Sequence, residues 1–337
     1  MREFLLSYGL FLAKTATLVA ALGLLLALVT ASIRALRHES GERLEIRNLN
    51  ERLRELTEAL NRELLDPAAR RREHRRLRRE HQARRKGAAK ARPRVFVLDF
   101  HGDLEASRVS TLREEISALL QVARPQHDEV LLRLESAGGA VPGYGLAASQ
   151  LQRIRDRGLA LTVAIDKVAA SGGYLMACVA ERILAAPFAI VGSIGVVGQL
   201  PNFNRWLREH HIDYELHTAG EYKRTLTLFG ENTEAARAKF REELEQVHGL
   251  FKDFVAQRRP ALELARVATG EYWYGTQALA LRLVDELATS DDYLLRRAQE
   301  ADVYELHFRR RRSLREQLLA NLTKLRARSL PLPPARP

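Results

Sequence analysis

The chain has 337 residues, of which 46% are hydrophobic, and a formal net charge of +12 at pH 7. This length and composition suffice for one large α/β core with appended segments. The single cysteine, Cys178, excludes an intrachain disulfide framework. The cysteine and histidine residues show no zinc-site spacing, and we expect neither a metal nor a cofactor.

The N-terminal residues 1–36 are predicted to form a single-pass transmembrane anchor. Residues 15–33 contain no charged side chain, and about 20 apolar residues are needed to cross a bilayer as a helix. The alternative is a cleaved signal peptide, with small residues at Val29 and Ala31 before a cut at Ser32. The length of the apolar run favours the anchor. The arginines that follow it favour a cytoplasmic position for the rest of the chain.

Residues 37–93 are predicted to form a charged linker. Leucines recur at helical spacing within residues 39–66, which indicates an amphipathic or coiled-coil helix. The basic run at 70–94 is interpreted as a solvated linker or helix, and contact with anionic lipid is the alternative. Nucleic-acid binding is disfavoured, because no aromatic residues are interleaved with the basic ones. Pro93 marks the boundary of the next domain.

Residues 94–308 are predicted to form the folded α/β domain. Apolar runs typical of strands alternate with helical segments, which favours a parallel sheet built from βαβ units. The expected strands are 94–100, 129–136, 159–166, 182–187, 189–197 and 214–219. The expected helices are 107–122, 143–157, part of 169–180, 202–211, 231–259, 261–268 and 275–283. The basic tail, 309–337, is predicted to be a peripheral helix followed by disorder.

Ser171 is the candidate nucleophile. It precedes Gly172 and Gly173 at the point where a predicted strand gives way to a predicted helix. A serine there exposes its hydroxyl, and the first helical turn has free N–H groups that can stabilise an oxyanion. The alternative is a helix N-cap followed by glycines that permit close packing. Gly138 and Gly139 follow another predicted strand, and they either point N–H groups at a ligand or form a tight turn.

Lys223 is the candidate general base. Its segment contains apolar and aromatic neighbours, namely Tyr222, Leu226, Leu228 and Phe229. Such neighbours reduce the hydration of a lysine and favour its neutral form, which can take the proton from a serine hydroxyl. The alternative is an ordinary surface lysine. Ser193 lies in an apolar run, where its hydroxyl needs a hydrogen-bond partner such as that amine or the local backbone.

Five segments taken together resemble a known family. They are LRLESAGGAVPGYGLAASQLQR, TVAIDKVAASGGYLMACVAERI, APFAIVGSIGVVGQLPNFNR, ELHTAGEYKRTLTLFGENT and ATGEYWYGTQALALRLVDE. On these motifs the chain resembles the signal-peptide-peptidase-like serine peptidases, in particular a branch found in the bacterial inner membrane. The resemblance implies a ClpP/crotonase-like fold and a Ser-Lys dyad. It assigns the nucleophile to Ser171, the base to Lys223, and the serine that holds the lysine to Ser193.

The resemblance also assigns an oxyanion hole. Its donors fall on Gly138 or Gly139, with the N–H of Gly172 as the second donor. The family commonly has proline before the paired glycines, where this chain has Ala137. Alanine at that position should loosen the turn slightly.

The resemblance further implies substrates, assembly and location. The expected substrates are signal-peptide remnants or unfolded segments close to the membrane, cleaved without a cofactor. The family assembles into rings or domes, so we expect a homo-oligomer in contact with membrane lipid and no nucleic-acid partner. The resemblance suggests that the domain lies on the outer face of the inner membrane, whereas the flanking charges favour the cytoplasm. The rival functions are a crotonase-like acyl-CoA enzyme and a proteolytically silent membrane scaffold.

Overall fold

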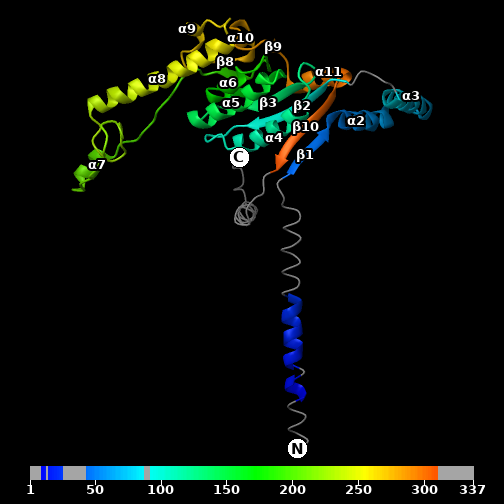
Figure 1. Cartoon of the computed structure of the whole chain (residues 1–337), viewed down its shortest axis with the longest axis horizontal. Helices are drawn as coiled ribbons and strands as arrows, with labels where there is room; N and C mark the ends of the chain where they lie inside the picture. Colours follow the sequence, from blue (N-terminus) through cyan, green and yellow to red (C-terminus); the bar gives the residue numbers. More distant parts are fainter. Residues whose placement is uncertain (1–8, 13, 26–42, 87–91, 310–337) are drawn as a thin grey trace, which may run out of the picture. The chain divides into compact units, whose positions relative to one another are not determined.

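The computed structural model of the chain describes residues 9–12, 14–25, 43–86 and 92–309 (Figure 1). The chain divides into two units, one made of residues 1–44 and 308–337 and the other of residues 45–307.

In the first unit, residues 9–12 and 14–25 are helical and their side chains are exposed. Within the described ranges, no helix combines the length and the apolar character that are needed to cross a membrane. Residues 1–8, 13 and 26–36 of the predicted anchor and residues 310–337 of the predicted tail lie outside the described residues. The anchor and the tail therefore stay predictions.

A seven-stranded sheet organises the fold. Its strands follow the order β1-β10-β2-β3-β4-β6-β9, and every pair from β10 to β9 is parallel. The bounds are β1 Arg43–Asn48, β2 Arg94–His101, β3 Glu129–Glu135, β4 Ala160–Ile165, β6 Arg182–Ala185, β9 Glu286–Leu287 and β10 Asp302–Arg309. Parallel strands that are covered on both faces have continuous apolar sequences. The strands predicted from such apolar runs at 94–100, 129–136, 159–166 and 182–187 match β2, β3, β4 and β6 and are confirmed.

One face of the sheet is covered by α4 (Val109–Val122) and α5 (Val141–Asp156). Alternate side chains of β2 point to this face, and Phe100 meets the ring of Tyr144 from α5 with 6.3 Å between centroids. Tyr144 is fully buried. A buried tyrosine hydroxyl needs a hydrogen-bond partner, and this one donates to the backbone carbonyl of Asp103, beyond the carboxyl end of β2.

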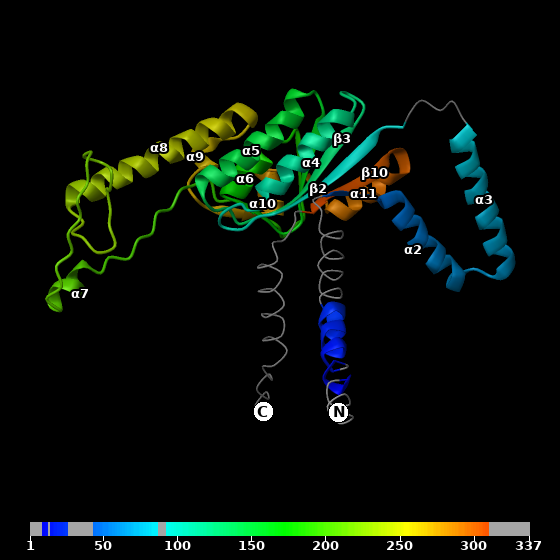
Figure 2. The same cartoon turned by 60° about the horizontal axis from the view of Figure 1, so that its bottom comes forward.

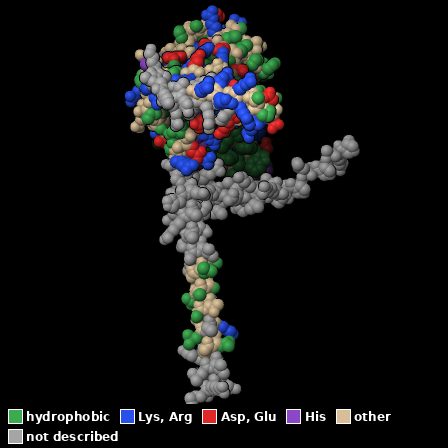
Figure 3. Space-filling view, turned by 90° about the vertical axis from the view of Figure 1, so that its right-hand side faces the viewer, with side chains coloured by type: hydrophobic (Ala, Val, Ile, Leu, Met, Phe, Trp, Pro, Cys, Tyr) green, Lys and Arg blue, Asp and Glu red, His purple; other side chains and the backbone are tan. Residues whose placement is uncertain are grey.

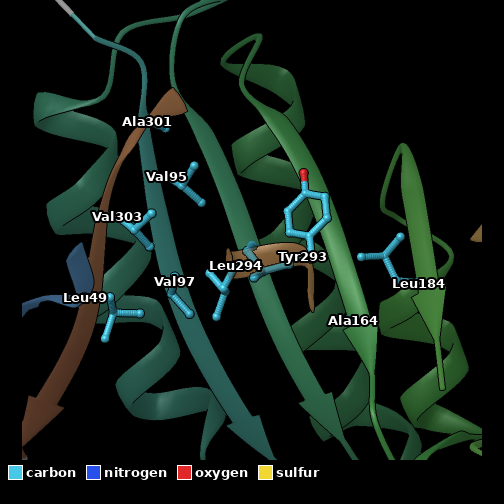
Figure 4. Packing of buried hydrophobic residues seen from close by; sticks show 10 residues of the cluster. Leu49, Val95, Val97, Ala164, Leu184, Tyr293, Leu294, Ala301 and Val303 are labelled. Atoms are coloured by element: carbon cyan, nitrogen blue, oxygen red, sulfur yellow. The ribbon is translucent and has the colours of Figure 1, made fainter. Parts of the chain in front are cut away.

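The opposite face is covered by α11 (Ser290–Glu300) and by the start of α2 (Leu49–Leu64). Tyr293 and Leu294 of α11 point onto the sheet (Figure 4). They belong to one buried cluster with Leu49, Val95, Val97, Leu131, Ala164, Leu184, Ala301 and Val303. Burying one side chain of the size of leucine stabilises the folded state by about 1.5–3 kcal/mol. The packing of helices on both faces therefore stabilises the sheet whose strand ends carry the site.

A second, smaller sheet lies next to the carboxyl end of β3. It contains β5 (Val168–Ala170) and β7 (Ile190–Gly192), which are parallel, and β8 (Tyr272–Tyr274), which is antiparallel to β7. Ser136, the residue after β3, forms an isolated bridge with Ala169 of β5. The short buried helix α6, residues 172–177, begins directly after β5. The end of β3 and the start of α6 are therefore brought together.

The remaining helices are α7 (Asn204–Glu209), α8 (Glu234–Arg258), α9 (Leu264–Val267) and α10 (Gly275–Ala280). Figures 1 and 2 show α8 extending beyond the sheet, with α7 and its flanking loops beside the N-terminal end of α8. The hydroxyl of Thr225 donates to Glu243 of α8 at 3.3 Å, so contacts with side chains of α8 hold this loop.

The basic run forms the helix α3 (Pro67–Lys86). The described arginine side chains of this helix are all exposed: Arg70, Arg71, Arg72, Arg75, Arg76 and Arg79. Figure 3, viewed from the side on which α3 lies in Figure 1, shows Lys and Arg side chains gathered toward the viewer. The helical form of this run is confirmed for these residues, and their exposure is consistent both with a solvated helix and with contact with anionic lipid.

Three predicted elements differ from the structure. Residues 39–66 are not one helix, because residues 43–48 form β1 and the Asn48 side chain caps α2 by accepting from the N–H of Glu51. The predicted strand at 189–197 ends at Gly192, where the backbone turns to positive φ. The predicted strand at 214–219 is irregular and exposed. Five further elements were not predicted from the sequence: β5, β8, β9, α11 and β10.

Candidate active site

Ser171 occupies a strained turn between β5 and α6. Its backbone has φ 51° and ψ −119°, a conformation that costs a non-glycine residue free energy and is often found at functional sites. The turn is held by the backbone, since the Ser171 N–H donates to the carbonyl of Gly192 at 2.8 Å. Its half-buried side chain makes no capping hydrogen bond to α6. The hydroxyl of Ser171 is thus left without a hydrogen-bond partner among the described residues.

The paired glycines after β3 form the turn that packs directly on Ser171. Gly138 has φ +93°, and a Cβ added to it would lie 2.7 Å from the Cβ of Ser171 and 2.9 Å from the N of Gly172. A Cβ on Gly139 would overlap the backbone of Leu104. Only glycine fits at either position, so the motif is required for close approach of two backbones. The structure brings Gly138, Gly139, Ser171 and Gly172 together.

The three glycines differ in what their N–H groups bind. The Gly138 N–H donates to the Oγ of Ser136 at 3.1 Å. The Gly139 N–H has no hydrogen-bond partner among the described residues. Gly172 is the first residue of α6, where the N–H groups of a helix lack intrahelical partners. Gly139 and Gly172 therefore have the N–H groups that are free to bind an anion beside Ser171.

Ser193 lies on the neighbouring turn. It follows Gly192, the residue whose carbonyl accepts the N–H of Ser171, and it has φ 51°. Its own N–H donates to the carbonyl of Glu271 at 2.6 Å. The structure thus places the two serines on adjacent turns that share a backbone hydrogen bond.

Lys223 lies in the loop between α7 and α8, and its side chain is exposed. Its backbone N–H donates to the carbonyl of Gly220 at 3.2 Å, and the ring of its neighbour Tyr222 lies 5.0 Å from the Nζ of Lys239 in α8. The helical rise of 1.5 Å per residue puts Lys239 about 18–24 Å from the buried part of α8, at residues 251–255. Figures 1 and 2 show this loop at the end of α8 distant from α6. A single chain does not bring Lys223 to Ser171.

Two side chains next to the nucleophile, Ser136 and Tyr144, were not predicted from the sequence. Ser136 Oγ lies 2.5 Å from the hydroxyl of Tyr144, and both residues are buried. Burial raises the pKa of the Tyr144 phenol, so this group stays protonated and remains a hydrogen-bond donor at neutral pH. The sequence signal that could have identified them is their place in the motif around the paired glycines. Ser136 lies two residues before Gly138, and Tyr144 lies six residues after it.

A metal site and a cysteine nucleophile are the alternatives to a serine nucleophile. No group of three or more His, Cys, Asp or Glu side chains in the described part of the chain could hold a metal ion. The thiol of Cys178 is buried, and burial raises its pKa to about 12. A thiol that stays protonated is a poor nucleophile, which leaves the hydroxyl of Ser171 as the better candidate.

The chain matches two family models and a set of related proteins. Residues 3–151 match peptidase family S49 N-terminal, and residues 153–304 match peptidase family S49. "Probable protease SohB" of Haemophilus influenzae is 58% identical over 220 residues, which cover 65% of this chain and 62% of that protein. "Probable protease SohB" of Buchnera aphidicola subsp. Acyrthosiphon pisum is 56% identical over 230 residues, which cover 68% of each chain.

The matched region thus covers about two thirds of the length of these relatives. The mixed α/β fold with its mostly parallel sheet fits the ClpP/crotonase-like expectation for this family. The chain belongs to peptidase family S49, in the branch of the SohB proteins.

Proposed function

We propose that this protein is a serine endopeptidase with Ser171 as nucleophile and Lys223 as general base. The observation that carries the proposal is the unbonded hydroxyl of Ser171 on its positive-φ turn, with the Gly138 turn packed against it. Membership of a peptidase family and the printed names of the relatives support the same reaction class. A serine hydroxyl needs a base to become a good nucleophile, and Lys223 is the residue that the family resemblance assigns.

The reaction proceeds through an acyl-enzyme. Neutral Lys223 takes the proton of Ser171 as its oxygen attacks the peptide carbonyl carbon, and the carbonyl oxygen becomes an oxyanion between the N–H groups of Gly139 and Gly172. The C–N bond then breaks, and the protonated lysine gives its proton to the leaving amine. Water then attacks the ester while the same lysine takes its proton, the C–O bond to Ser171 breaks, and the lysine passes this proton to the Ser171 oxygen. Each oxyanion donor contributes about a hundredfold to a thousandfold in rate.

A second copy of the chain supplies the lysine in this proposal. Lys223 is exposed and lies far from the Ser171 of its own chain, as the position of its loop at the N-terminal end of α8 indicates. The segment from residue 197 to residue 233, which includes α7 and the Lys223 loop, exposes large apolar side chains, and these favour self-association. The exposed fractions are 79% for Val197, 48% for Phe203, 53% for Trp206 and 40% for Phe229. A lysine from a neighbouring copy would enter beside Ser193, whose hydroxyl can hold the amine. A homo-oligomer is therefore part of the proposal.

The substrate class and the location are also proposals, and they rest on the family resemblance. We infer that the substrates are signal-peptide remnants or unfolded segments close to the membrane. The chain would be held at the bacterial inner membrane by residues 1–36. Protease accessibility of the folded domain in intact spheroplasts tests this location and shows on which side the domain lies.

The test of the dyad uses the full-length chain, an unfolded protein substrate and a fluorophosphonate probe. Ser171→Ala should lose both cleavage and labelling, and Lys223→Ala should lose cleavage. Arg224→Ala is the matched control, because it removes the neighbouring exposed cation of the same loop and should leave cleavage unchanged. Undiminished cleavage by Ser171→Ala or Lys223→Ala would refute the dyad.

Mixed oligomers test where the lysine comes from. Chains with Ser171→Ala and chains with Lys223→Ala are each inactive, but co-expressed they should regain part of the wild-type cleavage, because one copy keeps the serine and the other the lysine. If the mixture stays inactive although the two chains co-purify, the lysine acts within its own chain and the proposal of a shared site is wrong.

A further inference from the structure

A chain of hydrogen bonds runs from the turn beside Ser171 into the core. The Gly138 N–H donates to Ser136 Oγ at 3.1 Å, Ser136 Oγ lies 2.5 Å from the Tyr144 hydroxyl, and that hydroxyl donates to the Asp103 carbonyl at 2.9 Å. The direction of the chain follows from its ends, because an amide N–H only donates and a carbonyl only accepts. Ser136 must therefore donate to Tyr144. Both hydroxyls accept one bond and donate another, so the buried chain is complete.

The ring of Tyr144 also contacts the other side of the site. A Cβ added to Gly172 would overlap this ring, and it would lie 2.8 Å from the Cβ of Tyr144. A Cβ added to Gly102 would overlap the hydroxyls of both Ser136 and Tyr144. The ring of Tyr144 thus packs against Gly172, the residue after the nucleophile. Its hydroxyl holds the Gly138–Gly139 turn through Ser136, and these close contacts fix the position of the ring.

The hydrogen-bond chain decides which glycine can serve the oxyanion. The N–H of Gly138 is used by Ser136, whereas the N–H of Gly139 has no partner within the described residues. An N–H that is already bonded to a buried hydroxyl contributes little to a new anion, because the existing bond must first break.

We propose that Ser136 and Tyr144 are positioning residues, which lock the Gly138–Gly139 turn so that the N–H of Gly139 faces the oxyanion. This inference rests on the proposed peptidase function. Neither side chain touches the substrate. They act by holding one oxyanion donor at a fixed distance from Ser171, while the ring of Tyr144 holds the segment that carries the other donor, Gly172.

Two substitutions break the chain at different points. Tyr144→Phe keeps the ring but removes the acceptor for Ser136, and Ser136→Ala removes the acceptor for the Gly138 N–H. Because an oxyanion donor acts in the transition state, kcat should fall with little change in KM. We expect a fall in kcat of about tenfold to a hundredfold for each, smaller than the loss for a donor removed outright. The double variant should lose about as much as the more affected single variant, because both residues act as one unit.

The matched control is Tyr293→Phe. Tyr293 is also a buried tyrosine, and its hydroxyl bonds to Glu129 and Thr162, near the start of β3 rather than at its end. Its loss should lower thermal stability by an amount comparable to the loss at Tyr144 but leave kcat unchanged. If Tyr293→Phe lowers kcat as much as Tyr144→Phe does, or if Tyr144→Phe changes only KM, the positioning role is wrong.

A measurement that needs no activity separates this inference from the proposed function. Amide hydrogen exchange resolved to single residues should be slower at Gly138 than at Gly139 in the full-length wild-type chain, and Ser136→Ala should speed up exchange at Gly138. Equal exchange at the two glycines would overturn the positioning inference even if the protein is a peptidase. Slow exchange at Gly138 together with full activity of Ser171→Ala would instead overturn the peptidase proposal alone.

Discussion

Replacing Gly138 by alanine should disrupt the site through backbone geometry and close packing. The residue has φ +93°, and a new Cβ would lie 2.7 Å from the Cβ of Ser171. A backbone strained in this way costs about 1–3 kcal/mol, and overpacking in a filled site costs about 1–3 kcal/mol more. The total is about 2–6 kcal/mol, a large part of the roughly 5–15 kcal/mol by which a domain is stable.

Two measurements on the Gly138→Ala variant separate the outcomes. If the backbone stays in place, urea unfolding should show the loss of stability. If the turn shifts to relieve the overlap, the N–H of Gly139 moves and the rate of fluorophosphonate labelling should fall by up to about a hundredfold to a thousandfold.

The control is Gly145→Ala. Gly145 lies within α5, and a Cβ added to it meets nothing within 4 Å. Alanine is a better helix former than glycine, so this variant should gain about 0.5–1 kcal/mol and keep its labelling rate. Wild-type stability together with a wild-type labelling rate in Gly138→Ala would refute the reasoning.

Three further predictions concern the rest of the domain. Burial alone would raise the pKa of Asp128, but hydrogen bonds from Arg124 and Arg94 outweigh burial and lower that pKa. The unfolding free energy should therefore fall as the pH drops below about 4. A series of urea titrations at different pH values should show this fall, and Asp128→Asn should flatten it. Cys178, whose pKa burial raises to about 12, should be alkylated by iodoacetamide at pH 8 only after unfolding, as mass spectrometry can show. Asn50 binds one N–H and two carbonyls of the backbone, so Asn50→Ala should lower the urea-unfolding free energy by about 1–3 kcal/mol.

The central strands could be predicted from the sequence because they are covered on both faces. Most side chains of β2, β3 and β4 are buried, and apolar residues predominate in these strands. Strand β10, which lies between β1 and β2, has charged residues between its apolar ones and was not predicted. The helix expected over 39–66 failed for a related reason, since β1 (Arg43–Asn48) mixes charged and apolar residues and only the tertiary partner makes it a strand.

In the site too, features set by neighbouring residues could be predicted from the sequence, and features set by distant residues could not. The motif around Ser171 predicted a turn between a strand and a helix, and the paired glycines predicted a second tight turn, because these are consequences of neighbouring residues. The apolar neighbours of Lys223 suggested a desolvated lysine, but in a single chain its loop is exposed beside α8. Local sequence cannot show what surrounds a loop, since its surroundings come from elsewhere in the chain or from another copy.

Neighbouring residues along the chain are enough to show which positions can form the two turns and which hydroxyl stands at the start of a helix. The packing of distant segments was needed to show which amide beside Ser171 is free. The Gly138 N–H is occupied because Ser136 is held by Tyr144, and Tyr144 by the backbone at Asp103. A hydrogen bond depends on distance and direction in space, and these partners meet only when β2, β3 and α5 are packed together.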